Sequence, residues 1–194
     1  MSVSNNFDGF LYHITRYEKL DLGQKLQFGG KPNRFALNFS KLEFMVGDKD
    51  VNQLVIEKDL KDFNDAEKNI LKSYIYESCL ISRELILENV RQKNFPNLPS
   101  RLECIYCVKS LIDAKKWVQI LKRMDRKNPP LQIVKLKASG NLFCGDGSLI
   151  TRNTKSINSK IEMANNYWSK STTSENVELL FVGAVEVVEI VEDI

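Results

Sequence analysis

Runs of apolar and β-branched residues along the chain predict a set of β-strands. The first run combines aromatic and β-branched side chains around an Asp-Gly pair, and the last two are apolar on both faces, as in buried strands. Gly183 separates these last two runs and predicts a hinge between them. Strands are therefore expected at residues 7–16, 102–108, 131–138, 177–182 and 184–190.

Residues spaced three and four apart predict a long helix in the middle of the chain. Asn64 and Glu67 form a capping-box pattern at its start. The helix should end before Phe95-Pro96, because the residue preceding a proline disfavours helical geometry. Its inward-facing stripe is expected to be Leu71, Tyr74, Ser78, Ile81 and Leu85.

A second helix is expected to begin at Ser110, with Asp113 as the acidic residue of its first turn. It should stop before Pro129-Pro130, since a proline removes a helical donor and clashes with the preceding turn. One face of this helix is apolar and should pack on the core. That face holds Ala114, Trp117, Val118, Leu121 and Met124.

Glycine and proline mark the connections between these elements. Loops or turns are predicted at residues 23–32, 96–101 and 140–147, and the apolar residues of 161–168 suggest a short helix. The strands flank the helices without a strict βαβ alternation, which predicts an α+β fold rather than a doubly wound one. A chain of 194 residues has the length of one domain with room for a large insertion.

The composition narrows the class of protein. Apolar residues make up 43% of the chain and charged residues 27%, which excludes a disordered or collagen-like chain. No uncharged apolar run reaches the roughly 18 residues of a transmembrane helix, and the first residues lack the pattern of a signal peptide. We therefore expect a cytoplasmic protein without a membrane partner. The net charge of +3 is too small to indicate nucleic acid by itself.

One histidine and four scattered cysteines offer little to a metal ion. Cys104 and Cys107 have the CxxC spacing, but on a strand two sulfurs three residues apart point to opposite faces. No second pair is spaced to complete a zinc site. The chain is therefore expected to bind no metal and to carry free thiols.

Glu178 is the most informative charged residue. It heads an apolar strand, where an ionised carboxylate needs a partner or a ligand; the alternative is that it lies at the strand's mouth and points to water. His13, the only histidine, lies in the first strand, and alternation places it on one face with Thr15. A structural histidine held by a hydrogen bond is the alternative to a functional one.

Arg101 and two aromatic residues are further candidates. Arg101 follows a turn stiffened by prolines, and a guanidinium fixed in this way suits phosphate or carboxylate recognition, although pairing with Glu84 or Glu88 fits equally well. Tyr106 and Trp117 fit either core packing or the wall of a ligand site. The second helix has a basic face, which is either solvated or in contact with a polyanion. This face holds Lys115, Lys116, Lys122, Arg123, Arg126 and Lys127.

Taken in order, these residues resemble the motifs of the ADP-ribosyltransferase fold of the His-Tyr-Glu type. Leu11-Tyr12-His13-Ile14-Thr15 is similar to the first-strand motif of the DNA-modifying toxin branch and of several uncharacterised bacterial families. Ile105-Tyr106-Cys107-Val108, with Trp117, resembles the middle motif, and the run from Glu178 to Gly183 resembles the strand that carries the catalytic glutamate. The likeness is confined to about residues 10–25, 99–118 and 161–191.

The resemblance implies a split β-sheet with flanking helices, in a single domain over residues 1–194 with a helical insertion at about 40–95. It implies NAD as substrate and no metal. ADP-ribosyl transfer passes through an oxocarbenium-like transition state that an anion stabilises, as in glycoside cleavage. By resemblance Glu178 is the catalytic residue. The residues implied in NAD binding are His13 and Thr15 at the ribose, Tyr106 or Trp117 against the nicotinamide, and Arg101 or Arg16 at the pyrophosphate.

The implied activity is that of a mono-ADP-ribosyltransferase acting as an intracellular bacterial toxin or anti-phage effector. Its acceptor would be nucleic acid, either RNA or DNA, or a host protein, and an antitoxin would be a further partner. The basic helix favours nucleic acid slightly. Asn176 stands where arginine-directed members carry a glutamate, which argues against arginine as the acceptor. Two alternatives stay open, a non-catalytic binding module on the same fold and an NAD glycohydrolase.

Overall fold

The computed structural model describes residues 5–124, 128–150, 156–169 and 176–194 of the chain. These residues form an α+β fold, as the sequence predicts. In chain order the elements are β1 (Asn5–Thr15), β2 (Lys25–Phe28), α1 (Arg34–Phe39), β3 (Met45–Val46), β4 (Lys49–Asp50), α2 (Val51–Glu57), η1 (Leu60–Asp62), α3 (Asp65–Asn94), β5 (Ile105–Cys107), α4 (Leu111–Met124), β6 (Gln132–Asp146), η2 (Gly147–Leu149), α5 (Ile157–Ser169) and β7 (Val177–Asp193).

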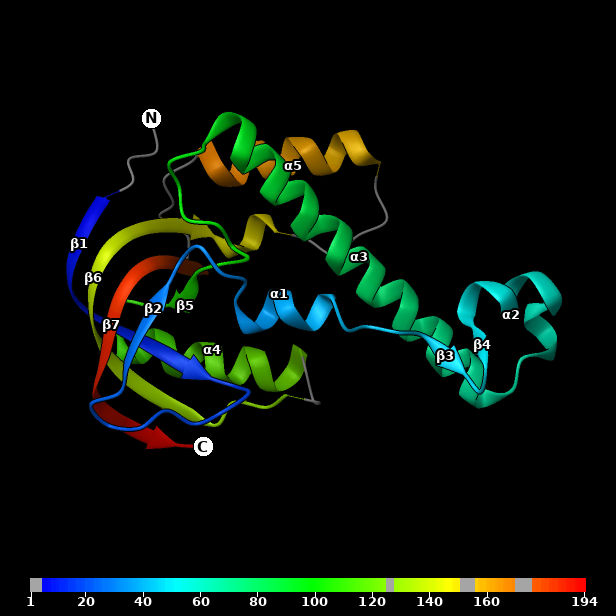
Figure 1. Ribbon diagram of the computed structural model, residues 1–194, viewed down its shortest axis with the longest axis horizontal. Helices are drawn as coiled ribbons and strands as arrows, with labels where there is room; N and C mark the ends of the chain where they lie inside the picture. The colour runs from blue at the N-terminus through cyan, green and yellow to red at the C-terminus, as the bar shows by residue number, and fades with distance from the viewer. Residues whose placement is uncertain (1–4, 125–127, 151–155, 170–175) are drawn as a thin grey trace.

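The main sheet is antiparallel and strongly curved (Figure 1). Its order is β1-β6-β7-β2, and the short β5 also pairs with β7. β5 and β2 occupy successive segments of the same side of β7, around Leu180 and Val185 respectively. A bridge between Tyr12 and Val108 joins β1 to the end of β5. This bridge brings the first strand next to β5, although more than ninety residues separate them in the sequence.

The two longest strands correct the sequence prediction. Of residues 140–147, expected as a turn, 140–146 continue β6 and Gly147 begins η2, and β7 runs through Gly183 without a break. Gly140 and Gly183 lie directly opposite each other in the β6–β7 ladder. A Cβ on Gly140 would overlap the carbonyl oxygen of Val182, and Gly183 has a φ of +144°. These glycines therefore permit close approach inside a sheet rather than a turn or a hinge.

The strand predicted at residues 102–108 is also shorter than expected. Only Ile105–Cys107 pair as β5. The Ser100 carbonyl accepts hydrogen bonds from the Glu103 and Cys104 amides, so the chain is still in a turn there. This turn carries Arg101 to the edge of the sheet.

Helix α3 begins and ends where the sequence predicts. The Asn64 and Glu67 side chains form the capping box, and Phe95 is the C-cap. The predicted inward stripe is wrong, however: Tyr74 is 41% and Leu85 58% exposed. Two features cause this difference. The N-terminal half of α3 extends beyond the sheet (Figure 1), and charged residues occupy part of the buried face. The buried residues of its C-terminal half are Leu80, Arg83, Glu84, Leu87 and Val90.

The other two predicted helices are confirmed. The Ser110 hydroxyl accepts from the Asp113 amide at the start of α4, and α4 packs through Ala114 and Val118 on Ile14 of β1. Helix α5 covers the predicted short helix and packs beside α3. Its Tyr167 and Trp168 are fully buried. Arg126 and Lys127, expected on the basic face of α4, lie outside the described residues.

A small outlying unit, here called the distal lobe, comprises residues 45–63. It includes β3, β4, α2 and η1, and lies at the N-terminal end of α3, away from the main sheet (Figure 1). Val51, Leu54 and Phe63 are its buried apolar residues. Within the described residues, no helix combines the length and the apolar character that a membrane crossing requires.

Candidate functional site

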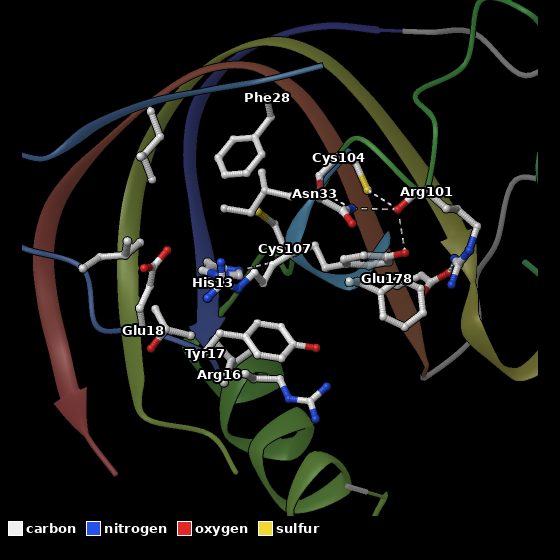
Figure 2. A pocket seen from close by; sticks show the side chains of 18 of the residues that line it. His13, Arg16, Tyr17, Glu18, Phe28, Asn33, Arg101, Cys104, Cys107 and Glu178 are labelled. Atoms are coloured by element: carbon white, nitrogen blue, oxygen red, sulfur yellow. Dashed lines mark hydrogen bonds and ion pairs between the residues drawn. The ribbon is translucent and has the colours of Figure 1, made fainter. Parts of the chain in front are cut away.

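The seven residues selected from the sequence all line one cavity of about 560 Å³. The residues are His13, Thr15, Arg16, Arg101, Tyr106, Trp117 and Glu178. They come from β1 and the loop after it, the turn before β5, β5 itself, α4 and the start of β7. Figure 2 shows His13 and Arg16 on one side of this space and Arg101 with Glu178 on the other. Segments far apart in the sequence therefore meet at one concave site.

His13 is held in a defined orientation on β1. Its Nδ1 lies 2.8 Å from the carbonyl oxygen of Tyr106, which can only accept, so Nδ1 carries the proton. Burial lowers the pKa of His13, although the carbonyl contact partly opposes this effect. The neutral ring therefore leaves Nε2 as a hydrogen-bond acceptor.

Thr15 follows two residues later, on the same face of β1. Its side chain is buried, yet Oγ1 has no hydrogen-bond partner among the described residues. A buried hydroxyl without a partner costs about 1–3 kcal/mol. Thr15 also lines the cavity, so Oγ1 is a candidate partner for a ligand bound there.

Arg16 directly follows the end of β1, and a residue far along the chain, Asn128, holds its side chain. Its Nε and Nη2 both donate to the Asn128 carbonyl oxygen, each at 3.0 Å. The guanidinium also lies 5.8 Å from the centre of the Tyr17 ring. This arrangement fixes a cation beside the cavity, where Figure 2 shows it below His13.

Glu178 does not point freely into water. The Arg101 Nη1 and the Tyr167 hydroxyl both donate to its Oε1, the second over 2.6 Å. The side chain is only 11% exposed. Within the described part of the chain no donor reaches its other oxygen, Oε2. The carboxylate is therefore fixed through one oxygen, and the other stays able to accept a hydrogen bond.

Arg101 is shared between two carboxylates. Besides Glu178, it contacts Glu84 of α3, whose Oε2 accepts from Nε at 2.8 Å. Pairing with Glu84, one of the two alternatives for this arginine, is thus what the structure contains, and Glu88 instead pairs with Arg91. With Nε and Nη1 both engaged by protein acceptors, Arg101 is less available to a phosphate than the sequence suggests.

Opposing effects set the protonation of this buried pair. Burial alone would raise the pKa of Glu84, but the Arg101 and Arg83 guanidinium groups outweigh it and hold that pKa below its usual range. Burial would lower the pKa of Arg101, but Glu178 and Glu84 raise it well above its ordinary value. Both groups are therefore charged at neutral pH.

Tyr106 and Trp117 line the cavity, and the polar atom of each is bound by a backbone carbonyl oxygen. The Tyr106 hydroxyl donates to the Arg101 carbonyl oxygen at 2.9 Å, and the Trp117 Nε1 donates to the Val177 carbonyl oxygen at 3.2 Å. Phe35 of α1 meets the Tyr106 ring edge-on, with 6.2 Å between ring centres. The cavity therefore has aromatic walls suited to a flat ring.

The cysteines are free thiols, as expected. Cys104 packs with the buried residues of α3 and α5, whereas Cys107 belongs to the apolar cluster between β1, β6 and β7, so the two thiols enter different clusters. Burial raises the pKa of both thiols well above the ordinary value. Among the described residues, no group of three histidine, cysteine or acidic side chains gathers as metal ligands.

Sequence reasoning missed three contributors to the site. Tyr167 is one of several aromatic residues of α5, and nothing in its spacing distinguishes it from core residues. Glu84 appears in the sequence only as a partner for Arg101. Asn33 caps α1 and donates to the carbonyl oxygens of Arg101 and Cys104, at 2.9 and 2.8 Å. An asparagine before a short helix was the available signal for this last contact.

Comparison with known proteins gives a family without an assigned activity. The family model DUF2441, described as a protein of unknown function, matches residues 11–193, and the chain belongs to this family. The matched region includes all seven residues described above. No curated protein matches the chain.

Proposed function

We propose that this protein is an NAD-dependent mono-ADP-ribosyltransferase, with an ADP-ribosyltransferase-like split sheet. The observation that carries the proposal is the meeting of His13, Tyr106 and Glu178, with their neighbours, around one cavity. Their order along the chain is that of the His-Tyr-Glu enzymes they resemble. A volume of about 560 Å³ suits a ligand of nucleotide size, since small-molecule sites typically measure roughly 300–1,000 Å³.

The chemistry assigns a task to each group. Breaking the bond between nicotinamide and ribose leaves positive charge on the ribose, which the Glu178 carboxylate stabilises while its Oε2 accepts the proton of the attacking nucleophile. His13 Nε2 accepts from a ribose hydroxyl, and Thr15 Oγ1 pairs with the same sugar. Tyr106 and Trp117 wall the nicotinamide, a cationic ring that aromatic faces attract.

Binding a pyrophosphate requires cations. Because Arg101 already pairs with Glu84 and Glu178, other cations that line the cavity are better placed to bind it. Arg16 lines the cavity, together with Lys31 of the loop between β2 and α1 and Arg34, the first residue of α1. Lys31 and Arg34 are exposed, so both side chains can turn toward a bound phosphate. We assign the phosphates to these three residues.

The acceptor is proposed to be nucleic acid or a host protein, in a toxin or anti-phage effector that an antitoxin restrains. The basic face of α4 supports nucleic acid less strongly than the sequence suggests. Lys115 lies 3.5 Å from Glu192, and Lys116 lies 3.9 Å from Asp113, so acidic neighbours offset part of that charge. Lys122 and Arg123 are also exposed and form no ion pair with the described residues.

The test is transfer of label from radiolabelled NAD in cell extract, comparing wild type with Glu178→Gln. Glu189→Gln is the matched control, because Glu189 is an exposed glutamate of the same strand. Transfer that requires Glu178 supports the proposal, and nuclease or protease sensitivity of the label identifies the acceptor. Release of nicotinamide without transfer indicates an NAD glycohydrolase. The absence of both transferred label and released nicotinamide would overturn the enzyme proposal.

A non-catalytic binding module is the second candidate, and the charge network favours it. Arg101 joins Glu84 and Glu178 within the interior, an arrangement that also suits a purely structural role. This candidate predicts that NAD leaves the melting temperature unchanged. It also predicts that Glu178→Gln lowers stability without removing any activity.

A further inference from the structure

Two donors from different elements meet at one oxygen of Glu178. Tyr167 reaches Oε1 from α5, and Arg101 reaches it from the turn before β5. We infer that Tyr167 and Glu84 are positioning residues for this carboxylate, Tyr167 directly and Glu84 by holding Arg101. The inference rests on the proposed function in one respect, since it takes Glu178 as the reacting carboxylate. It explains why Oε1 is occupied while Oε2 is not.

Tyr167 can reach Glu178 because the strand between them lacks a side chain. Gly145 of β6 is the cross-strand partner of Glu178. A Cβ on Gly145 would lie 2.6 Å from the Tyr167 hydroxyl oxygen and from its ring. The Tyr167 ring is locked in turn against Phe143 and Trp168, with ring centres 5.4 and 4.7 Å apart. A glycine and two aromatic neighbours thus aim one hydroxyl at the carboxylate.

The Tyr167 hydroxyl is a donor rather than an acceptor toward Glu178. Burial, and then the charge of Glu178, raise the pKa of Tyr167 well above its ordinary value. The hydroxyl therefore stays protonated and donates a hydrogen bond to Oε1. The same oxygen atom of Tyr167 accepts from Arg101 Nη1 at 2.9 Å. The three groups form a closed triangle of hydrogen bonds, which restricts each of them more than a single bond does.

Glu84 anchors the other side of Arg101. Its side chain is fully buried on α3, where Oε2 accepts from Arg101 Nε and Oε1 accepts from Arg83 Nε at 3.0 Å. Two acceptors on adjacent guanidinium nitrogens fix the plane of Arg101. A purely structural Glu84 would stabilise the fold without affecting the reaction, so the test must separate these roles.

Steady-state NAD turnover in Tyr167→Phe and Glu84→Gln provides the first measurement. Tyr74→Phe and Glu88→Gln are controls on α3, the second in an ion pair with Arg91. We expect kcat to fall about 10- to 100-fold in the two test variants, with KM for NAD changed less than about twofold. The controls should keep wild-type kcat. Wild-type kcat in both test variants of an active enzyme would overturn the inference.

Double-mutant cycles on unfolding stability give a second measurement that needs no activity. Glu178→Gln is combined with Tyr167→Phe and, separately, with Glu84→Gln. Glu84 and Glu178 share Arg101 as a partner, so their effects should be non-additive. Additive effects in both cycles would overturn the inference. A wild type without NAD turnover would defeat the proposed function, and the cycles would then report only whether Tyr167 and Glu84 are coupled to the Glu178 side chain.

Discussion

A substitution at Thr15 tests whether a single atom, the hydroxyl oxygen Oγ1, binds a ligand or stabilises the fold. Thr15→Val keeps the shape of the side chain and removes the hydroxyl that finds no partner among the described residues. We expect the ligand-free protein to gain up to about 1 kcal/mol, since an unpartnered buried hydroxyl is unfavourable. NAD binding should weaken about tenfold, which corresponds to roughly 1.4 kcal/mol. Urea unfolding and isothermal titration measure the two effects.

Thr15→Ser is the control for this prediction, because it keeps the hydroxyl while losing a methyl group. It should lose stability yet retain NAD affinity. A Thr15→Val protein that binds NAD as tightly as wild type would remove Thr15 from the site. A large loss of stability in that variant would instead show that Oγ1 has a structural partner.

The sequence predicts those site residues whose pattern lies within one element of the fold. His13 and Thr15 follow from strand alternation, and Glu178 from a charge at the head of an apolar strand. Tyr167 was not predictable, because its role depends on the absence of a side chain at Gly145, a residue of another element. The sequence also does not decide which glutamate pairs with Arg101. Glu84 and Glu88 of α3 both fit, and only tertiary packing selects Glu84.

At the scale of elements, glycine accounts for the largest errors. A glycine in a sequence indicates either a turn or a close approach of two chains, and the local pattern does not distinguish them. Capping boxes and prolines were more reliable because both act within one turn of helix, as at Asn64 and Phe95 of α3. Helix caps and helix ends, which act locally, are correctly predicted, whereas the glycines of β6 and β7 and the buried face of α3 depend on neighbouring elements and are not.

Gly140→Ala tests the close approach of β6 and β7. The new methyl group would overlap the Val182 carbonyl oxygen, which is backbone and cannot rotate away. We expect a loss of about 1–3 kcal/mol, as for other overpacked sites, measured by urea unfolding. Gly9→Ala on β1 is the control, because its nearest neighbour is the movable ring of Phe7. Equal effects of the two substitutions would contradict this account of Gly140.

At the scale of the whole molecule, the distal lobe lies apart from the cavity. Arg83, in the C-terminal half of α3, lines the cavity, whereas the distal lobe lies at the N-terminal end of this helix (Figure 1). α2 packs on α3 and β4, and β3 packs on β4 and α3. The resemblance implies a helical insertion at about residues 40–95, but it does not indicate that the distal lobe lies away from the main sheet. Helical spacing predicts the length of α3 and not which elements pack against it.

Leu54→Ala tests whether the distal lobe opens independently of the rest of the protein. Leu54 is buried with Val51 and Phe63, and truncating a buried leucine typically costs about 2–5 kcal/mol. Because few buried apolar residues hold the lobe, this loss should exceed its local stability and unfold it. Hydrogen exchange should then accelerate in α2 and the start of α3, while β6 and β7 stay protected and the cavity keeps its affinity for NAD. Leu180→Ala, in the main sheet, should instead lower protection throughout the protein. Loss of protection in β6 and β7 of the Leu54→Ala protein would show that the lobe and the sheet fold as one cooperative unit.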